Sequence, residues 1–162
     1  MKIISHRGNL DGPNIERENT LSYIDEALSH GYDAEIDLRV QHGVLHLGHD
    51  RPDRQINYLD LKDRRQRLWM HCKDILSFSY CSGGRAFCHK SDPFSIVTNG
   101  PWISSNNGFM WVHDLSLELT RDSVIPLISK EDIDNFDLER AKCIYGICTD
   151  YPNYLKEQLS DQ

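Results

Sequence analysis

The segment Asp33–Val40 constrains the fold of this chain more than any other. In it, charged residues alternate with apolar or small ones, in the order Asp-Ala-Glu-Ile-Asp-Leu-Arg-Val. Successive side chains of a β-strand point to opposite faces, so a strand with this pattern has one charged face and one apolar face. The charged face consists of Asp33, Glu35, Asp37 and Arg39.

Two interpretations of this strand differ in which face turns inward. In the first, the strand lies at a sheet surface with its charged side in water. In the second, Glu35 and Asp37 point into a pocket as oxygen ligands for a hard divalent cation such as Mg²⁺ or Ca²⁺. The apolar side chains then pack outward beneath helices. Complementary groups on neighbouring strands would favour the second interpretation.

The hydrophobic pattern predicts alternating strands and helices in the first half of the chain. Strands are expected at 2–5, 33–40, 44–47 and 68–73, and helices at about 20–30 and 58–67. Such alternation favours a parallel sheet or barrel, formed by residues 1–162 as one domain. Short strands are expected later at 86–89, 95–98, 109–113, 124–128 and 144–148, with brief helices at 131–141 and 154–159. These late strands lack full crossover helices, so either some are antiparallel or loops replace the helices.

Composition argues against several classes of function. The formal net charge of −7 is atypical of a nucleic-acid-binding protein, which usually has a basic surface. No basic-then-apolar leader follows Met1, and no apolar run approaches the ~20 residues of a membrane-spanning helix, so we expect no membrane insertion. The five cysteines are irregularly spaced, which is typical of a reduced, cytoplasmic protein rather than of a disulfide framework.

Polar side chains lie at or just beyond the ends of several expected strands. They are His6, Arg7, Glu35, Asp37, His49, Asp50, His71, Lys73 and Asp150. In (β/α) barrels the active site lies at the carboxyl ends of the strands. Imidazoles, carboxylates and cations gathered there indicate metal-assisted phosphoryl or acyl chemistry. The sequence has no Gly-x-Ser-x-Gly, Gly-x-Gly-x-x-Gly or P-loop motif, which argues against a serine nucleophile and a nucleotide cofactor.

Four motifs follow one another in the first third of the chain: Ser5-His6-Arg7-Gly8, Glu18-Asn19-Thr20, Glu35-Ile36-Asp37 and Gly48-His49-Asp50. Their order and spacing resemble the signature of the glycerophosphodiester phosphodiesterase family. The segment Tyr145–Pro152 is similar to the last strand of that family, and Trp69–Lys73 stands where the family has a Glu-x-Lys strand.

The resemblance implies a compact TIM-barrel-like (β/α) barrel, with several helices shortened or replaced by loops, that hydrolyses a small phosphodiester substrate. It also implies residue roles: His6 and His49 as general acid and base, Arg7 and Lys73 for the phosphate, and Glu35, Asp37, Glu18 and His71 for a divalent metal. In this superfamily the nucleophile is commonly the substrate's own adjacent hydroxyl, which gives a cyclic phosphate that can then be hydrolysed.

Three features depart from the family pattern. The chain is shorter than its usual members, Arg17 replaces the proline before Glu18, and His71 replaces the glutamate that completes the metal site. We expect Mg²⁺ or Ca²⁺ as the metal. Mn²⁺ is an alternative because imidazole ligates transition metals better than it ligates hard cations.

Other interpretations of the same residues remain open. A barrel that has lost catalysis would bind a phosphorylated ligand or a protein partner without turnover, although retention of both His6 and His49 favours an enzyme. A related enzyme could act on a lipid or sugar phosphodiester, or release a cyclic product. In purely structural interpretations, Arg7 pairs with Asp37 or Glu35 in a buried ion network. Likewise, His71 is a packed interior residue. His89 and His113 end late strands, where they either line the pocket or serve as structural or surface residues.

Overall fold

The computed structural model describes residues 1–81, 84–98 and 108–160. Its strands are β1 (Lys2–His6), β2 (Asp33–Gln41), β3 (Val44–Leu47), β4 (Arg54–Gln55), β5 (Leu68–Cys72), β6 (Arg85–Phe87), β7 (Phe94–Val97), β8 (Phe109–Val112), β9 (Ser123–Pro126) and β10 (Gly146–Thr149). Its α-helices are α1 (Leu21–Ser29), α2 (Tyr58–Lys62), α3 (Lys130–Asn135) and α4 (Pro152–Ser160). Short 3₁₀ turns are η1 (Arg65–Arg67), η2 (Ser77–Tyr80) and η3 (Leu138–Cys143).

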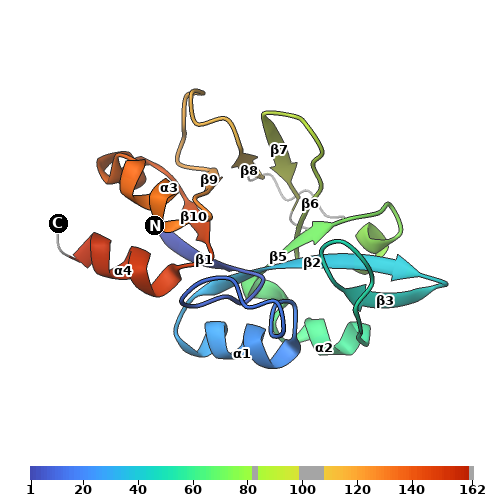
Figure 1. Ribbon diagram of the computed structural model, residues 1–162. Coiled ribbons are helices and arrows are strands. Elements are labelled where there is room, and N and C mark those ends of the chain that lie inside the picture. Colours follow the sequence, from blue (N-terminus) through green and yellow to red (C-terminus); the bar gives the residue numbers. More distant parts are fainter. Residues whose placement is uncertain (82–83, 99–107, 161–162) are drawn as a thin grey trace.

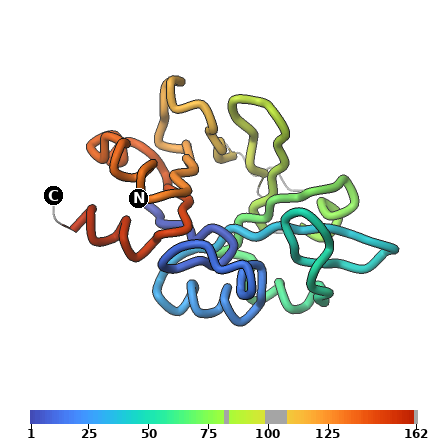
Figure 2. Tube along the Cα trace, in the orientation of Figure 1, coloured from blue at the N-terminus to red at the C-terminus, as the bar shows by residue number. Residues whose placement is uncertain are grey.

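All the described strands belong to one mixed sheet that curls into a partial barrel (Figure 1). Its parallel part runs in the order β6-β5-β2-β1-β10-β9-β8. Three strands are antiparallel to their neighbours: β3 pairs with β2, β4 with β3, and β7 with β8. The first and last strands of the chain, β1 and β10, are parallel neighbours, which brings segments from both ends of the chain together (Figure 2).

The prediction of a TIM-barrel-like (β/α) barrel is wrong. Within the described residues, ten strands are accompanied by only four short α-helices, and strands and helices do not alternate along the second half. The physical reason is chain length between strands. The connection from β8 to β9 spans residues 113–122 without a helix, although parallel neighbours normally need a crossover of a dozen or more residues. The expected helix at 58–67 also shortens to α2 and the η1 turn.

Helix α1 forms as the sequence predicts. The side-chain oxygen of Thr20 accepts a hydrogen bond from the backbone N–H of Tyr23 and so caps the first turn. The helix ends before Gly31, whose positive φ of 91° is readily adopted by glycine. Tyr23, Ile24 and Ala27 form its buried face. The expected helix at 20–30 is confirmed.

Strand β2 turns its charged face inward. Ala34, Ile36 and Leu38 pack in one cluster with Ile24 of α1 and Leu61 of α2, on the side of the sheet that these helices cover (Figure 1). On the opposite side, the carboxylate residues Glu35 and Asp37 are each only 1% exposed. The surface-strand interpretation is therefore wrong, and the prediction that the apolar face packs beneath helices is confirmed.

A second apolar cluster fills the inside of the curled sheet. It consists of Ile4, Trp69, Phe87, Val97, Trp111, Val124 and Cys148. Ile4 and Trp69 precede His6 and His71 by two residues on their strands, so each shares a face with the polar residue beyond it. The cluster thus forms the floor beneath the polar strand ends.

Strand β7 has little helical cover, whereas the late strands β9 and β10 pack with α3 and α4. Ile96 of β7 is 67% exposed and Phe94 is 45% exposed.

Among the described residues, no helix combines the length and the apolar character needed to cross a membrane.

Gly48 shapes the loop after β3, and its replacement tests that loop. An alanine Cβ at Gly48 (φ 151°) would lie 2.1 Å from the carbonyl oxygen of Arg51. At Gly43 (φ 78°), by contrast, no heavy atom of the described residues lies within 4 Å of such a Cβ. We expect Gly43→Ala to lower the free energy of unfolding by about 1–2 kcal/mol, the cost of a left-handed alanine. Gly48→Ala should lower the free energy of unfolding clearly more, because the backbone must also move to relieve the contact with Arg51 O. Urea unfolding of both variants measures this difference, and equal losses would contradict the clash.

Candidate active site

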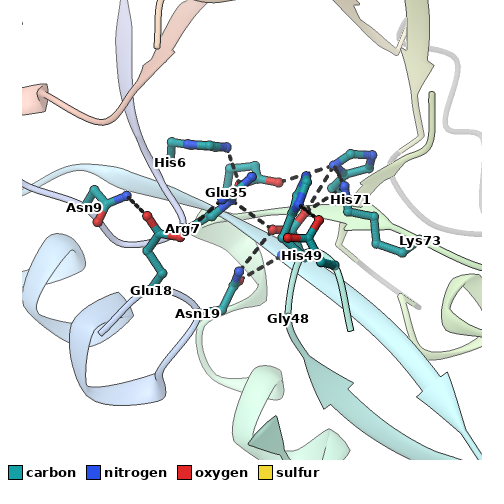
Figure 3. Close-up of polar contacts among 12 residues, drawn as sticks. His6, Arg7, Asn9, Glu18, Asn19, Glu35, Gly48, His49, His71 and Lys73 are labelled. Carbon is teal, nitrogen blue, oxygen red and sulfur yellow. Dashed lines mark hydrogen bonds and ion pairs between the residues drawn. The ribbon is translucent and has the colours of Figure 1, made fainter. Parts of the chain in front are cut away.

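Parallel pairing brings the polar strand ends together. In the sheet register, His6 of β1 lies opposite Glu35 of β2, and Asp37 of β2 lies opposite His71 of β5. Their side chains converge with that of His49 from the loop after β3 (Figure 3). The groups that were predicted to converge therefore come from the adjacent strands β1, β2 and β5 and from the loop after β3.

Glu35, Asp37 and His71 form a cluster suited to a metal ion. Each offers one ligand atom, these atoms lie within 4.8 Å of one another, and all three residues are buried. The Nδ1 atom of His71 lies 3.3 Å from Asp37 Oδ1 and 3.7 Å from Glu35 Oε1. Glu35 Oε2 is buried and finds no hydrogen-bond partner among the described residues. Buried polar atoms are rarely left in this state, so the donor set fits a divalent cation.

The carboxylate of Asp37 is held from several sides. The side chain of Asn19 donates to Asp37 Oδ2 (3.0 Å) and accepts from the backbone N–H of Asp37 (3.0 Å). Arg7 Nε lies 3.1 Å from Asp37 Oδ2, and Lys73 Nζ lies 3.1 Å from Asp37 Oδ1. Burial favours the neutral acid, but the contacts with His71, Lys73 and Arg7 outweigh it and hold the pKa of Asp37 well below its usual range.

Arg7 occupies an unusual backbone conformation at the end of β1. Its φ is 54°, in the left-handed region that residues with a side chain rarely adopt. Two backbone hydrogen bonds fix it there: Arg7 N–H donates to Glu35 O (2.9 Å), and Asn19 N–H donates to Arg7 O (3.0 Å). The guanidinium is thereby directed at Asp37 and Glu18. The interpretation of Arg7 as part of an ion network has direct support in these contacts.

Glu18 lies outside the metal-compatible cluster. Its carboxylate accepts hydrogen bonds from Arg7 Nη1 (3.2 Å) and Asn9 Nδ2 (3.0 Å). The structure therefore places Glu18 beside Arg7, whose side chain it orients. It does not belong to the cluster of Glu35, Asp37 and His71.

His6 is paired with the carboxylate of Asp150, a strand-end residue to which the sequence assigned no specific role. Its Nδ1 atom lies 2.7 Å from Asp150 Oδ1, and Asn9 Nδ2 donates to the same oxygen (2.8 Å). Burial lowers the pKa of His6, but the hydrogen bond to Asp150 and the charge of Glu35 outweigh this and raise it. Since Asp150 accepts at Nδ1, the Nε2 atom is directed toward Glu35, 3.9 Å from Oε2. The position of Asp150 at the end of the last strand was the available sequence signal.

His49 approaches from the opposite side on a loop. Its Nδ1 atom lies 2.8 Å from Asp50 Oδ1, and the side chain is 40% exposed. Arg39 Nε donates to the carbonyl of Gly48 (3.1 Å) and to that of His49 (3.2 Å), which ties the loop to β2. Asp50 thus contacts the ring of His49 at the same atom at which Asp150 contacts that of His6, but the side chain of Asp50 is 93% exposed and that of Asp150 only 6%.

Two cavities meet at these residues. One has a volume of about 460 Å³ and includes Glu18, Asp50 and Asp150 in its wall. The other, of about 350 Å³, reaches Glu35 and His71. Both are lined by His6, Arg7, His49 and Ile128. A ligand centred at His6 and His49 could therefore place one substituent on each side.

The wall of the second cavity contains His89 and His113, for which the sequence left open a place in the pocket or a structural or surface role. The ring of His89 stacks on that of His71, with ring centroids 4.4 Å apart, and the ring centroid of His113 lies 4.1 Å from that of His89. Burial, together with the charge of His71, lowers the pKa of His89 to about 3 and lowers that of His113. Both rings are thus neutral near pH 7. Their positions at the ends of late strands were the sequence signal for the cavity wall, but the contact between the two rings did not follow from it.

Comparisons with protein-family models, curated proteins and solved structures found no match to this chain. The resemblance to glycerophosphodiester phosphodiesterases therefore stays a prediction that rests on the motifs and on the site they form.

The cluster predicts different effects of two glutamate substitutions on metal binding. Glu35→Gln removes a charged ligand atom and should weaken Mn²⁺ binding by at least about 10–100-fold, the loss typical even of groups that only support a ligand. Glu18→Gln is the matched control, because its carboxylate contacts Arg7 and Asn9 rather than the cluster. Calorimetric titration of each protein with Mn²⁺ measures the affinities. Equal losses in the two variants would contradict this assignment of ligands.

Proposed function

We propose that this protein is a metal-dependent phosphodiesterase that hydrolyses small phosphodiesters. The observation that carries the proposal is the His6–Asp150 pair beside the buried Glu35–Asp37–His71 cluster, at the junction of two cavities. An oriented imidazole, a metal-compatible donor set and space for two substituents are the components that cleavage of a phosphodiester requires.

Glu35, Asp37 and His71 would hold the divalent cation. When bound, such a cation offsets phosphate charge and lowers the pKa of a hydroxyl or water. Mg²⁺ or Ca²⁺ fits the two carboxylates, and the imidazole of His71 also makes Mn²⁺ suitable.

The two histidines supply proton transfer. His6 exposes Nε2 because Asp150 binds its Nδ1, and His49 is oriented in the same way by Asp50. Imidazoles exchange protons readily near neutral pH, so one ring can accept the proton of the nucleophile while the other donates to the leaving alkoxide. The nucleophile is water, or an adjacent hydroxyl of the substrate in the variant of the reaction that forms a cyclic phosphate first.

Arg7, which lines both cavities, and Lys73, which lies just beyond β5, would offset the charge of the phosphate. Both also contact Asp37, at 3.1 Å each, so they share their charge between this carboxylate and a ligand. In a chain with a net charge of −7, such local cations are needed to attract an anionic substrate.

The same contacts support a second candidate function, the binding of a phosphorylated ligand without turnover. Arg7 and Lys73 already offset the charge of Asp37, so the network is stable in a protein that holds no metal. A binding protein, however, has no need for two carboxylate-oriented histidines around one cavity.

Hydrolysis assays with histidine variants separate these functions. We expect wild-type protein to hydrolyse a glycerophosphodiester and an aryl phosphodiester in the presence of Mg²⁺, Ca²⁺ or Mn²⁺, and to stop when a chelator is added. His6→Ala and His49→Ala should each lower kcat by about 10²–10⁴-fold, the usual contribution of an acid or base. Phosphorus NMR of the products distinguishes a cyclic phosphate from a monoester.

His30→Ala is the matched control, because His30 is exposed and lies at the end of α1. It should retain wild-type activity. No turnover with any of the three metals, together with equal binding of the diester by all variants, would refute the enzyme and favour the binding protein.

A further inference from the structure

Two buried cysteines lie in contact beside the site. Cys72 is the last residue of β5 and Cys81 follows the η2 turn, and their Sγ atoms are 3.4 Å apart. Each residue is 3% exposed. Sulfur atoms at this distance touch, so a disulfide needs an approach of only about 1.4 Å to reach its bond length of about 2.05 Å.

The segment between them is already held in a compact turn. One carboxylate oxygen of Asp74 accepts from the backbone N–H of Ser77 (2.8 Å), and the other accepts from that of Val40 on β2 (2.9 Å). The thiol of Cys81 also lies within hydrogen-bond reach of the carbonyl of Ser77 (3.4 Å). These contacts fix Cys81 against Cys72, so bond formation requires little reorganisation of the backbone.

One of the two cysteines borders a cavity at the surface of the molecule. Cys72 lines a cavity of about 270 Å³ that includes Ile75, His89 and the exposed Cys88 in its wall. Ile75 is 88% exposed, which places this cavity at the surface. Cys81, by contrast, is not part of that wall.

We propose that Cys72 and Cys81 are a site of reversible oxidation, at which hydrogen peroxide converts the pair to an intramolecular disulfide. The proposal does not depend on phosphodiester hydrolysis. It also differs from the simplest account of buried cysteines, in which they serve only as small apolar side chains.

The chemistry proceeds in two displacements. Cys72 Sγ attacks one peroxide oxygen, the O–O bond breaks, and Cys72 becomes a sulfenic acid while the departing oxygen leaves as water with the thiol proton. Cys81 Sγ then attacks the Cys72 sulfur, the S–S bond forms, and the S–O bond breaks to release a second water. Two thiols lose two electrons in total, and hydrogen peroxide gains them.

The link bears on the site through its position. Cys72 stands between His71 and Lys73, so the disulfide anchors the point of β5 from which both side chains extend. Thiol reductants of the cell restore the dithiol, as is usual for intracellular disulfides that form transiently.

Peptide mapping tests the proposal directly, because trypsin places the three nearby cysteines on different peptides. Cleavage after Arg67, Lys73, Arg85 and Lys90 gives peptides 68–73, 74–85 and 86–90, which contain Cys72, Cys81 and Cys88 respectively. The folded full chain is treated with hydrogen peroxide, alkylated, digested without reduction and analysed by mass spectrometry. We expect peptides 68–73 and 74–85 to be joined, with the loss of two hydrogen masses, and to separate on reduction.

Matched variants identify the partners. Cys88→Ser should retain the link, and Cys81→Ser should abolish it and leave Cys72 as an unresolved sulfenic acid that traps dimedone. Oxidised wild type should also unfold at a temperature several degrees above that of the reduced protein, because the link restricts the unfolded chain. A link from Cys72 to Cys88, or alkylation of both Cys72 and Cys81 after peroxide treatment, would overturn the proposal.

Discussion

The buried carboxylate of Asp37 joins the parts of the molecule that form the site. It contacts Asn19 from the loop before α1, Arg7 at the end of β1, and His71 and Lys73 at the end of β5. An ionised carboxylate that is only 1% exposed would be very costly without such partners. The contacts therefore do two things at once. They offset the cost of burying the charge, and they fix the relative positions of the groups around it.

The contacts of Asp37 with His71 and Lys73 also affect how the cluster would bind a metal. Asp37 Oδ1 lies 3.3 Å from His71 Nδ1 and 3.1 Å from Lys73 Nζ. A cation held by Glu35, Asp37 and His71 would share this oxygen with Lys73, so metal affinity and the position of Lys73 are coupled. Because a phosphate would also draw on Lys73, metal and substrate are expected to assist each other in this cluster.

Helical cover of the sheet is uneven. Strand β2, which carries Glu35 and Asp37, packs beneath α1 and α2. Strand β7 has little cover, since Ile96 is 67% exposed, and none of its residues lines the two cavities that meet at the site. The buried carboxylates therefore lie on a strand that is packed against helices. The redox pair Cys72–Cys81 lies at the end of β5.

The sequence by itself determined the features that depend on local pattern: the alternation of β2, the capped helix α1, and the order of the motifs that contain His6, Glu35, Asp37 and His49. These follow from side-chain period and backbone capping, which act within a few residues. The partners of the strands were decided by tertiary structure, since pairing is a contact between distant segments. The expected barrel was therefore wrong, whereas antiparallel late strands were one of the two arrangements left open, and β7 runs antiparallel to β8. Tertiary contacts alone placed Asp150 against His6 and Glu18 on Arg7 instead of in the metal cluster, and they decided that His89 and His113 lie in the cavity wall. Each of these depends on strands that are remote in sequence but adjacent in the sheet.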